Sequence, residues 1–148
     1  MKIKHFLTDE RLLRGPWQSF ERDVARLLLH NNFKDVRVVG QSGDNGADIL
    51  ATNEAGLWVI QCKHTTTSFP PKAALEEVVH AGEYYRADNL AVATSRPPGD
   101  SFLRKRAEYK KLGINIRCLA PKQLLILAER GANFSSNMKL LRDYQESA

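Results

Sequence analysis

The sequence predicts an α/β (α+β) domain in which a mixed β-sheet of about five strands is flanked by helices on both sides. Segments with apolar residues at helical spacing alternate with short β-branched segments, in the order helix, three strands, helix, strand, helix, strand, helix. The 148 residues fit one domain with a core of its own. Apolar residues make up 43% and charged residues 26%, which is typical of a soluble globular protein and excludes a disordered chain.

The chain divides into a short lead-in, one domain and a tail. We expect a polar lead-in over residues 1–14, the folded domain over residues 15–130 and a polar tail over residues 131–148. Three apolar residues of the tail are spaced as on one helical face, which would let it dock as a further helix: Met138, Leu141 and Tyr144.

The first half of the domain is expected to form one helix and three strands. The helix covers residues 16–30, because proline suits the first helical position and an apolar stripe follows. The stripe consists of Trp17, Phe20, Val24, Leu27 and Leu28. Three β-branched segments predict strands over 36–39, 47–52 and 57–64. Turn-forming residues separate these strands, at 40–46 and at 53–56.

The second half alternates helices and strands. Two prolines open a helix over 70–85, and the apolar segment 90–94 predicts a central strand. Asp100 begins a helix that Gly113 ends. A last strand over 114–119 and a short helix over 121–129 complete the domain.

Charge and cysteine content restrict the function classes. The formal net charge is +5 and the pI is about 9.4, which suits an acidic polymer as partner without requiring one. No apolar segment approaches the length of a membrane span, and no signal-peptide core follows the N-terminus. Cys62 and Cys118 lie far apart and outside any CxxC pair, so we expect no zinc knuckle or disulfide and a reducing, cytoplasmic setting.

Glu21 is the first residue that breaks the apolar pattern. Its position on the helical wheel places it with the buried stripe of the first helix. A buried carboxylate is costly unless it is paired or bound to a cation. The ordinary alternative is an acid at the edge of the stripe that meets a lysine or arginine.

Asp48 is the second such residue, because aspartate is disfavoured in a strand. If residues 53–56 form the hairpin loop, Thr52 pairs with Leu57 and Asp48 lies opposite Gln61. Strand alternation places Lys63 on the same face as Gln61. The opposite face would pack on a helix and carries Ile49, Ala51, Trp58, Ile60 and Cys62.

A carboxylate, an amide and an ammonium in one patch suggest metal-assisted chemistry on phosphate. Mg²⁺ prefers oxygen ligands, which Asp48, the backbone carbonyl of Cys62 and the amide of Gln61 would supply. Glu21 would hold a further metal ligand or a water, and Lys63 would orient water or stabilise charge on the phosphorane. The alternative is a simple Asp48–Lys63 salt bridge beside a neutral Gln61.

These residues resemble the PD-(D/E)xK nuclease superfamily, and more closely its Mrr-like restriction endonuclease domains with a QxK element. The similarity covers about residues 16–128. Its main motifs are Phe20-Glu21, the glycine-rich segment 43–49 ending in Asp48-Ile49, and Val59-Ile60-Gln61-Cys62-Lys63. The segments 84–88, 91–95 and 113–114 are also similar to the family's later helix and strands.

The resemblance implies a restriction-endonuclease-like fold and a Mg²⁺-dependent DNA endonuclease in which Mn²⁺ substitutes. Asp48 would be the principal metal ligand, Gln61 the second motif residue, Lys63 the catalytic lysine and Glu21 the helix acid. The neutral Gln61 leaves one-metal and two-metal mechanisms open. Cleavage of both strands would need two active sites, hence a homodimer. No motif that recognises a DNA sequence, such as a helix-turn-helix or a zinc finger, is visible in the chain. Target recognition would therefore depend on a separate partner, on DNA shape or on DNA modification.

Two other functions stay open: structure-specific cleavage of the Holliday-junction type, and a non-catalytic nucleic-acid-binding module that retains the fold. Weaker candidates for DNA contact lie in the loop before Asp48, beside the lysine, at the end of the fourth strand and on the basic helix. They are Gln41, Ser42, His64, Arg96, Arg104, Lys105 and Lys110.

Overall fold

The computed structural model describes residues 17–39, 48–65 and 69–131. Its elements are α2 (Trp17–His30), β1 (Lys34–Val38), β2 (Ile49–Asn53), β3 (Gly56–Lys63), α3 (Ala73–Tyr85), β4 (Asn89–Thr94), α4 (Asp100–Lys111) and β5 (Ile116–Leu119). A helix over 121–131 follows β5. The fold class and the order of elements predicted from the sequence are confirmed.

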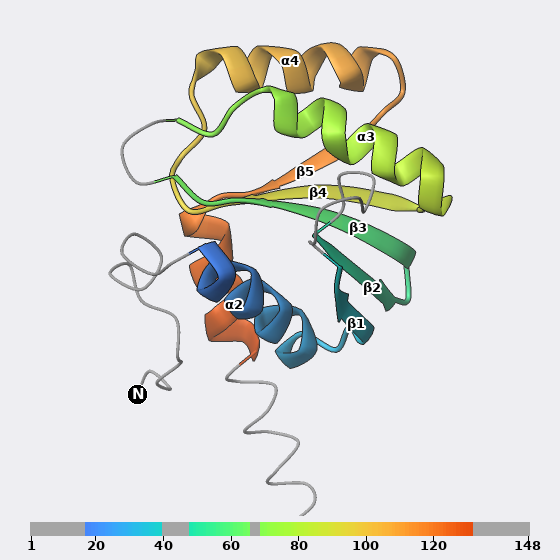
Figure 1. The fold of residues 1–148 in the computed structure, drawn as a ribbon, viewed down its shortest axis with the longest axis vertical. Coiled ribbons are helices and arrows are strands. Elements are labelled where there is room, and N and C mark those ends of the chain that lie inside the picture. Colours follow the sequence, from blue (N-terminus) through green and yellow to red (C-terminus); the bar gives the residue numbers. More distant parts are fainter. Residues whose placement is uncertain (1–16, 40–47, 66–68, 132–148) are drawn as a thin grey trace, which may run out of the picture.

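The five strands form one mixed sheet in the order β1-β2-β3-β4-β5 (Figure 1). The pairs β1–β2 and β2–β3 are antiparallel, whereas β3–β4 and β4–β5 are parallel. The parallel pairs follow from the crossover helices α3 and α4, because parallel neighbours need a long connection. The segment expected to be a central strand, residues 90–94, forms the interior strand β4 between β3 and β5, whereas β3 is the middle strand of the sheet.

Helices cover both faces of the sheet (Figure 1). On one face, α2 and the helix over 121–131 enclose a core with Ile49, Ile60 and Ala91. On the other face, α3 and α4 enclose a second core with Val59 and Val92. The side chain of Asn31 joins the two helices of the first face, donating hydrogen bonds to the carbonyl oxygens of Leu27 (2.8 Å) and Leu127 (2.9 Å).

Several boundaries differ from the sequence prediction by two or three residues. β1 begins at Lys34, and β2 begins at Ile49, so Asp48 precedes the ladder as a bend. α3 begins at Ala73 because a turn, closed by the Ala74 amide on the Pro71 carbonyl (3.1 Å), follows the prolines. β5 begins at Ile116, since residues 113–115 complete the turn after α4. The lead-in 1–14, the loop 40–46 and tail residues 132–148 lie outside the described residues.

The hairpin between β2 and β3 has the register that the sequence predicted. Thr52 pairs with Leu57 and Ile49 with Ile60, while the ladder extends to Asn53 and Gly56 and shortens the loop to two residues. The faces also agree, because Ile49, Ala51, Ile60 and Cys62 are buried in the core beneath α2, with Trp58 packed against it.

The turn between β2 and β3 requires a glycine at position 56. Its φ of +107° is strained for any residue with a side chain, and an added Cβ would collide with the carboxylate of Asp88. That carboxylate accepts a hydrogen bond from the Leu57 amide (2.8 Å), which ties the hairpin to the start of β4.

We predict that Gly56→Ala lowers the free energy of unfolding by about 1–3 kcal/mol, because it adds backbone strain and displaces Asp88. Denaturant unfolding followed by circular dichroism measures the change. Glu54→Ala, at an exposed position of the same turn, is the control and should stay within about 0.5 kcal/mol of the parent. A Gly56→Ala protein as stable as the parent would contradict this reading.

Candidate active site

Asp48 lies where β2 and β3 begin to separate, and backbone contacts hold it on two sides. Its amide donates to the Ile60 carbonyl (3.2 Å), and its own carbonyl accepts from the Val39 amide (2.7 Å). Its Oδ2 accepts a hydrogen bond from the Cys62 amide (2.7 Å). The residue is 9% exposed, and the Ile49–Ile60 pair places it opposite Gln61, as the sequence predicted. One carboxylate oxygen is thus fixed by the backbone of β3.

Glu21 approaches Asp48 from α2. The residue is 8% exposed, which confirms its place in the buried stripe. Burial, the nearby charge of Asp48 and a hydrogen bond to Asp48 raise the pKa of Glu21 to about 7. Among the residues that the structure describes, the partner of Glu21 is therefore a second carboxyl group and not the lysine or arginine of the ordinary alternative. With this pKa, Glu21 is partly protonated near neutral pH.

The pKa of Asp48 is also raised, chiefly because the carboxyl group is buried. The Cys62 amide, the Lys63 charge and the hydrogen bond from Glu21 act in the opposite direction, whereas the Glu77 charge raises this pKa further. Asp48 is therefore within electrostatic reach of groups on both faces of the sheet, from α2 and from α3.

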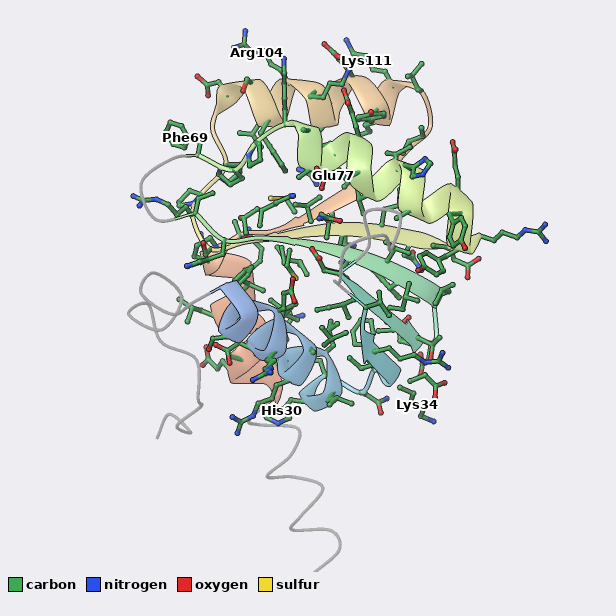
Figure 2. The ribbon with its side chains drawn as sticks, viewed as in Figure 1. His30, Lys34, Phe69, Glu77, Arg104 and Lys111 are labelled. Atoms are coloured by element: carbon green, nitrogen blue, oxygen red, sulfur yellow. The ribbon has the colours of Figure 1, made fainter. Side chains whose placement is uncertain are left out.

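Gln61 and Lys63 point to the other face of the sheet, toward α3. Gln61 is 4% exposed, and its Oε1 is buried without a hydrogen-bond partner among the described residues. The Lys63 ammonium lies 2.9 Å from Oε2 of Glu77. Figure 2 shows Glu77 on the side of α3 that faces the sheet. The lysine therefore pairs with Glu77 and does not form the Asp48–Lys63 bridge that was the alternative reading.

Ser95, directly after β4, holds the backbone at the end of β3 in place through hydrogen bonds to Lys63 and Thr65. Its amide donates to the Lys63 carbonyl (3.1 Å), and its hydroxyl accepts from the Thr65 amide (3.0 Å). The hydroxyl also donates to the Thr65 carbonyl (3.3 Å). These bonds continue the β3–β4 ladder past Lys63 and restrict the backbone on which the lysine sits.

The arrangement offers oxygen atoms suited to a hard divalent cation. The Cys62 amide points toward Asp48, and the carbonyl of a strand residue lies on the same side as its amide, so the Cys62 carbonyl also faces Asp48. This carbonyl, the second Asp48 oxygen and the orphaned Gln61 amide oxygen form a donor set that fits Mg²⁺ or Mn²⁺. No group of three or more His, Cys, Asp or Glu side chains suited to a metal occurs among the described residues. A cation held by this donor set would bind amide and backbone oxygens in addition to the Asp48 carboxylate.

The weaker candidates for DNA contact lie in different parts of the chain. The His64 ring lies 5.8 Å from that of Phe20 on α2, and its Nδ1 is buried without a hydrogen-bond partner among the described residues. Arg96 is half-buried just beyond β4. Gln41 and Ser42 lie outside the described residues.

α4 lies on the same side of the sheet as α3 and contacts β5, where Arg106 donates a hydrogen bond to the Ile116 carbonyl (2.6 Å). Figure 2 shows Arg104 and Lys111 on the side of α4 turned away from the sheet. Arg104 and Lys110 are exposed, and Lys105 lies 3.7 Å from Glu108 and 5.4 Å from the Tyr109 ring centroid. The structure does not bring these residues together with Asp48.

Sequence reasoning missed Glu77 and Ser95. Glu77 lies next to the buried Val78 on α3 and resembles any polar residue at the edge of an apolar stripe. Only the packing of α3 on β3 reveals its partner. Ser95 carried a weak signal, since it directly follows the strand that runs parallel to β3.

The chain belongs to the restriction endonuclease family. Residues 12–115 match the family of Mrr-type catalytic domains described as restriction endonuclease. Membership in this family supports a DNA nuclease. No curated protein matches the sequence.

Among solved structures, the chain is similar to the MspJI restriction endonuclease in complex with a 27-mer oligonucleotide. The TM-score is 0.55 at 16% sequence identity, over 85% of this chain and 32% of that chain. At this identity the similarity shows a shared fold, and the present chain spans about a third of the length of that enzyme. No helix among the described residues is long and apolar enough to cross a membrane, and Cys62 and Cys118 are both free thiols.

The Glu21–Asp48 pair predicts a pH-dependent stability. The raised pKa means that the folded protein binds more protons than the unfolded chain between the ordinary value of 4.5 and about 7. Stability therefore decreases as the pH rises through this window. In chelator, Glu21→Gln should be more stable than the parent at pH 8 by about 1–2 kcal/mol after allowance for solvent screening, and similar to it at pH 5.

Thermal or urea unfolding at both pH values measures this difference. Glu129→Gln, at an exposed position in the helix over 121–131, is the control and should track the parent at both pH values. A Glu21→Gln protein that loses stability at pH 8 would mean that the ionised carboxylate of Glu21 has a favourable partner.

Proposed function

We propose that this domain is a metal-dependent endodeoxyribonuclease of the Mrr-like restriction type, which hydrolyses DNA phosphodiester bonds with Mg²⁺ and accepts Mn²⁺. One observation carries the proposal. Asp48, fixed by the Cys62 amide, lies opposite the orphaned amide oxygen of Gln61 and beside Lys63. This constellation occurs in a chain that belongs to a restriction endonuclease family.

The residues divide the work by their chemistry. Asp48, the Cys62 carbonyl and the Gln61 amide oxygen would hold the cation, and Glu21 would hold a further metal ligand or a water beside Asp48. A divalent cation bound there supplies Lewis-acid polarisation of the phosphate. Lys63 presents a positive charge to the phosphorane that forms when water attacks phosphorus, and it helps to orient that water. Glu21, whose pKa is raised to about 7 beside Asp48, would give up its proton to solvent on cation binding.

DNA would reach this site from the end of the sheet where β3 and β4 finish. His64 and Arg96 lie at that end and would contact phosphates. Gln41 and Ser42, in the loop that leads to Asp48, would do the same. Arg104, Lys105 and Lys110 would meet a more distant part of the duplex, because the structure does not bring them together with Asp48.

The nuclease domain would span residues 15–130, with residues 131–148 as a tail. Double-strand cleavage would require two copies, so we propose a homodimer. Selection of the target would fall to a partner protein or to DNA shape or modification. Cytoplasmic DNA in a defence setting would be the substrate.

We predict that Asp48→Asn and Lys63→Ala each lower the rate of Mg²⁺-dependent DNA cleavage at least about 100-fold. Asp48→Asn removes the charged ligand of the cation, and Lys63→Ala removes the positive charge that stabilises the phosphorane. Gel assays of supercoiled and linear DNA measure the rate. Asp100→Asn and Lys122→Ala alter exposed residues of the same charge and should cleave at the parental rate.

Circular dichroism should show the parental fold for all four variants, and chelator should abolish cleavage by the parent. Unchanged cleavage in both Asp48→Asn and Lys63→Ala would contradict the proposal. The same assay on branched and modified DNA decides between restriction-type and structure-specific cleavage. Metal-independent binding without cleavage of any DNA would favour the non-catalytic module.

A further inference from the structure

The Lys63 ammonium has three acceptors in its neighbourhood and contacts one of them. Gln61 is two residues away on the same face of β3, with a buried oxygen that lacks a hydrogen-bond partner among the described residues. Asp48 is near enough for the Lys63 charge to act on it. The ammonium instead lies 2.9 Å from Glu77 of α3. The lysine is therefore held toward α3 and does not pair with the oxygens of Gln61 and Asp48.

The ion pair contributes little to the stability of the fold. The side chains of Lys63 and Glu77 are 25% and 40% exposed. Pairs this exposed contribute about 0–1 kcal/mol, because water screens the charges and two long side chains lose freedom. Its consequence is instead geometric, since it determines where the Lys63 ammonium rests.

The position of the Lys63 ammonium matters because residue 61 is a neutral glutamine. With an amide at 61, the carboxylates that interact with Lys63 among the described residues are those of Asp48 and Glu77. Without Glu77, the ammonium would turn to Asp48, whose Oδ2 is already taken by the Cys62 amide. A lysine on the remaining oxygen would occupy the position that a cation needs.

We propose that Glu77 is a positioning residue, which holds the Lys63 ammonium on the α3 side and thereby keeps Asp48 and Gln61 open to a divalent cation. The inference rests on the proposed function, because it concerns the same site. Glu77 acts through Lys63 and does not itself bind the metal.

The test is Mn²⁺ binding without DNA, measured by the electron paramagnetic resonance signal of free Mn²⁺. Glu77→Gln should weaken Mn²⁺ binding about tenfold when Lys63 is present, the scale expected when a partner that orients a metal site is lost. In a Lys63→Met background the same substitution should weaken binding no more than about threefold, because the competing ammonium is gone. Glu77→Asp keeps the charge and should restore most of the affinity.

Glu76→Gln is the matched control, since Glu76 is the preceding residue of α3 and is exposed. It should bind Mn²⁺ as the parent does. The melting temperature of Glu77→Gln should stay near that of the parent, because the pair is partly exposed.

Two other results would contradict the positioning role of Glu77. An equal loss of Mn²⁺ affinity with and without Lys63 would mean that Glu77 binds the metal or attracts it by its negative charge alone. No loss of affinity in Glu77→Gln would mean that Glu77 has no role in Mn²⁺ binding. Either result contradicts the positioning role and leaves the nuclease proposal standing. Mn²⁺ affinity that survives Asp48→Asn, or a parent that binds no Mn²⁺, would contradict the metal site and with it both proposals.

Discussion

The hydrogen bond from the Cys62 amide to Asp48 Oδ2 is the contact on which the rest of the site depends (2.7 Å). It exists because the β2–β3 hairpin has one register, fixed by Thr52 opposite Leu57 and by a two-residue turn. A shift of one residue would move every side chain of one strand to the other face. Asp48 would then lose the amide, and Gln61 and Lys63 would face α2.

The site contains buried polar groups that lower the stability of the folded protein. Two carboxyl groups, Glu21 and Asp48, are buried together, and burial raises the pKa of both. The amide oxygen of Gln61 is buried without a hydrogen-bond partner among the described residues. Buried polar groups are normally satisfied, and clusters that are not commonly serve a function. The two packed cores, one on each face of the sheet, compensate for these costs.

The sequence predicted the fold class, the element order and the hairpin register, because apolar spacing and turn residues are local signals. It also predicted the burial of Glu21 and the placement of Asp48 opposite Gln61, since both follow from periodicity. The partners of Glu21 and Lys63 could not be predicted, because they depend on how α2 and α3 pack on the sheet. Glu77 carried no local signal, and the ends of strands shifted where turns compete with the ladder, as at Asp48.

The most direct test of the central claim is a crystal structure of this protein with DNA and Mn²⁺, with the cation located by anomalous scattering. We expect an anomalous peak between the Asp48 carboxylate and the Cys62 carbonyl, with a DNA phosphate against it and the Lys63 ammonium facing that phosphate. DNA bound along another face, with no Mn²⁺ at Asp48, would show that Asp48 is not the metal site.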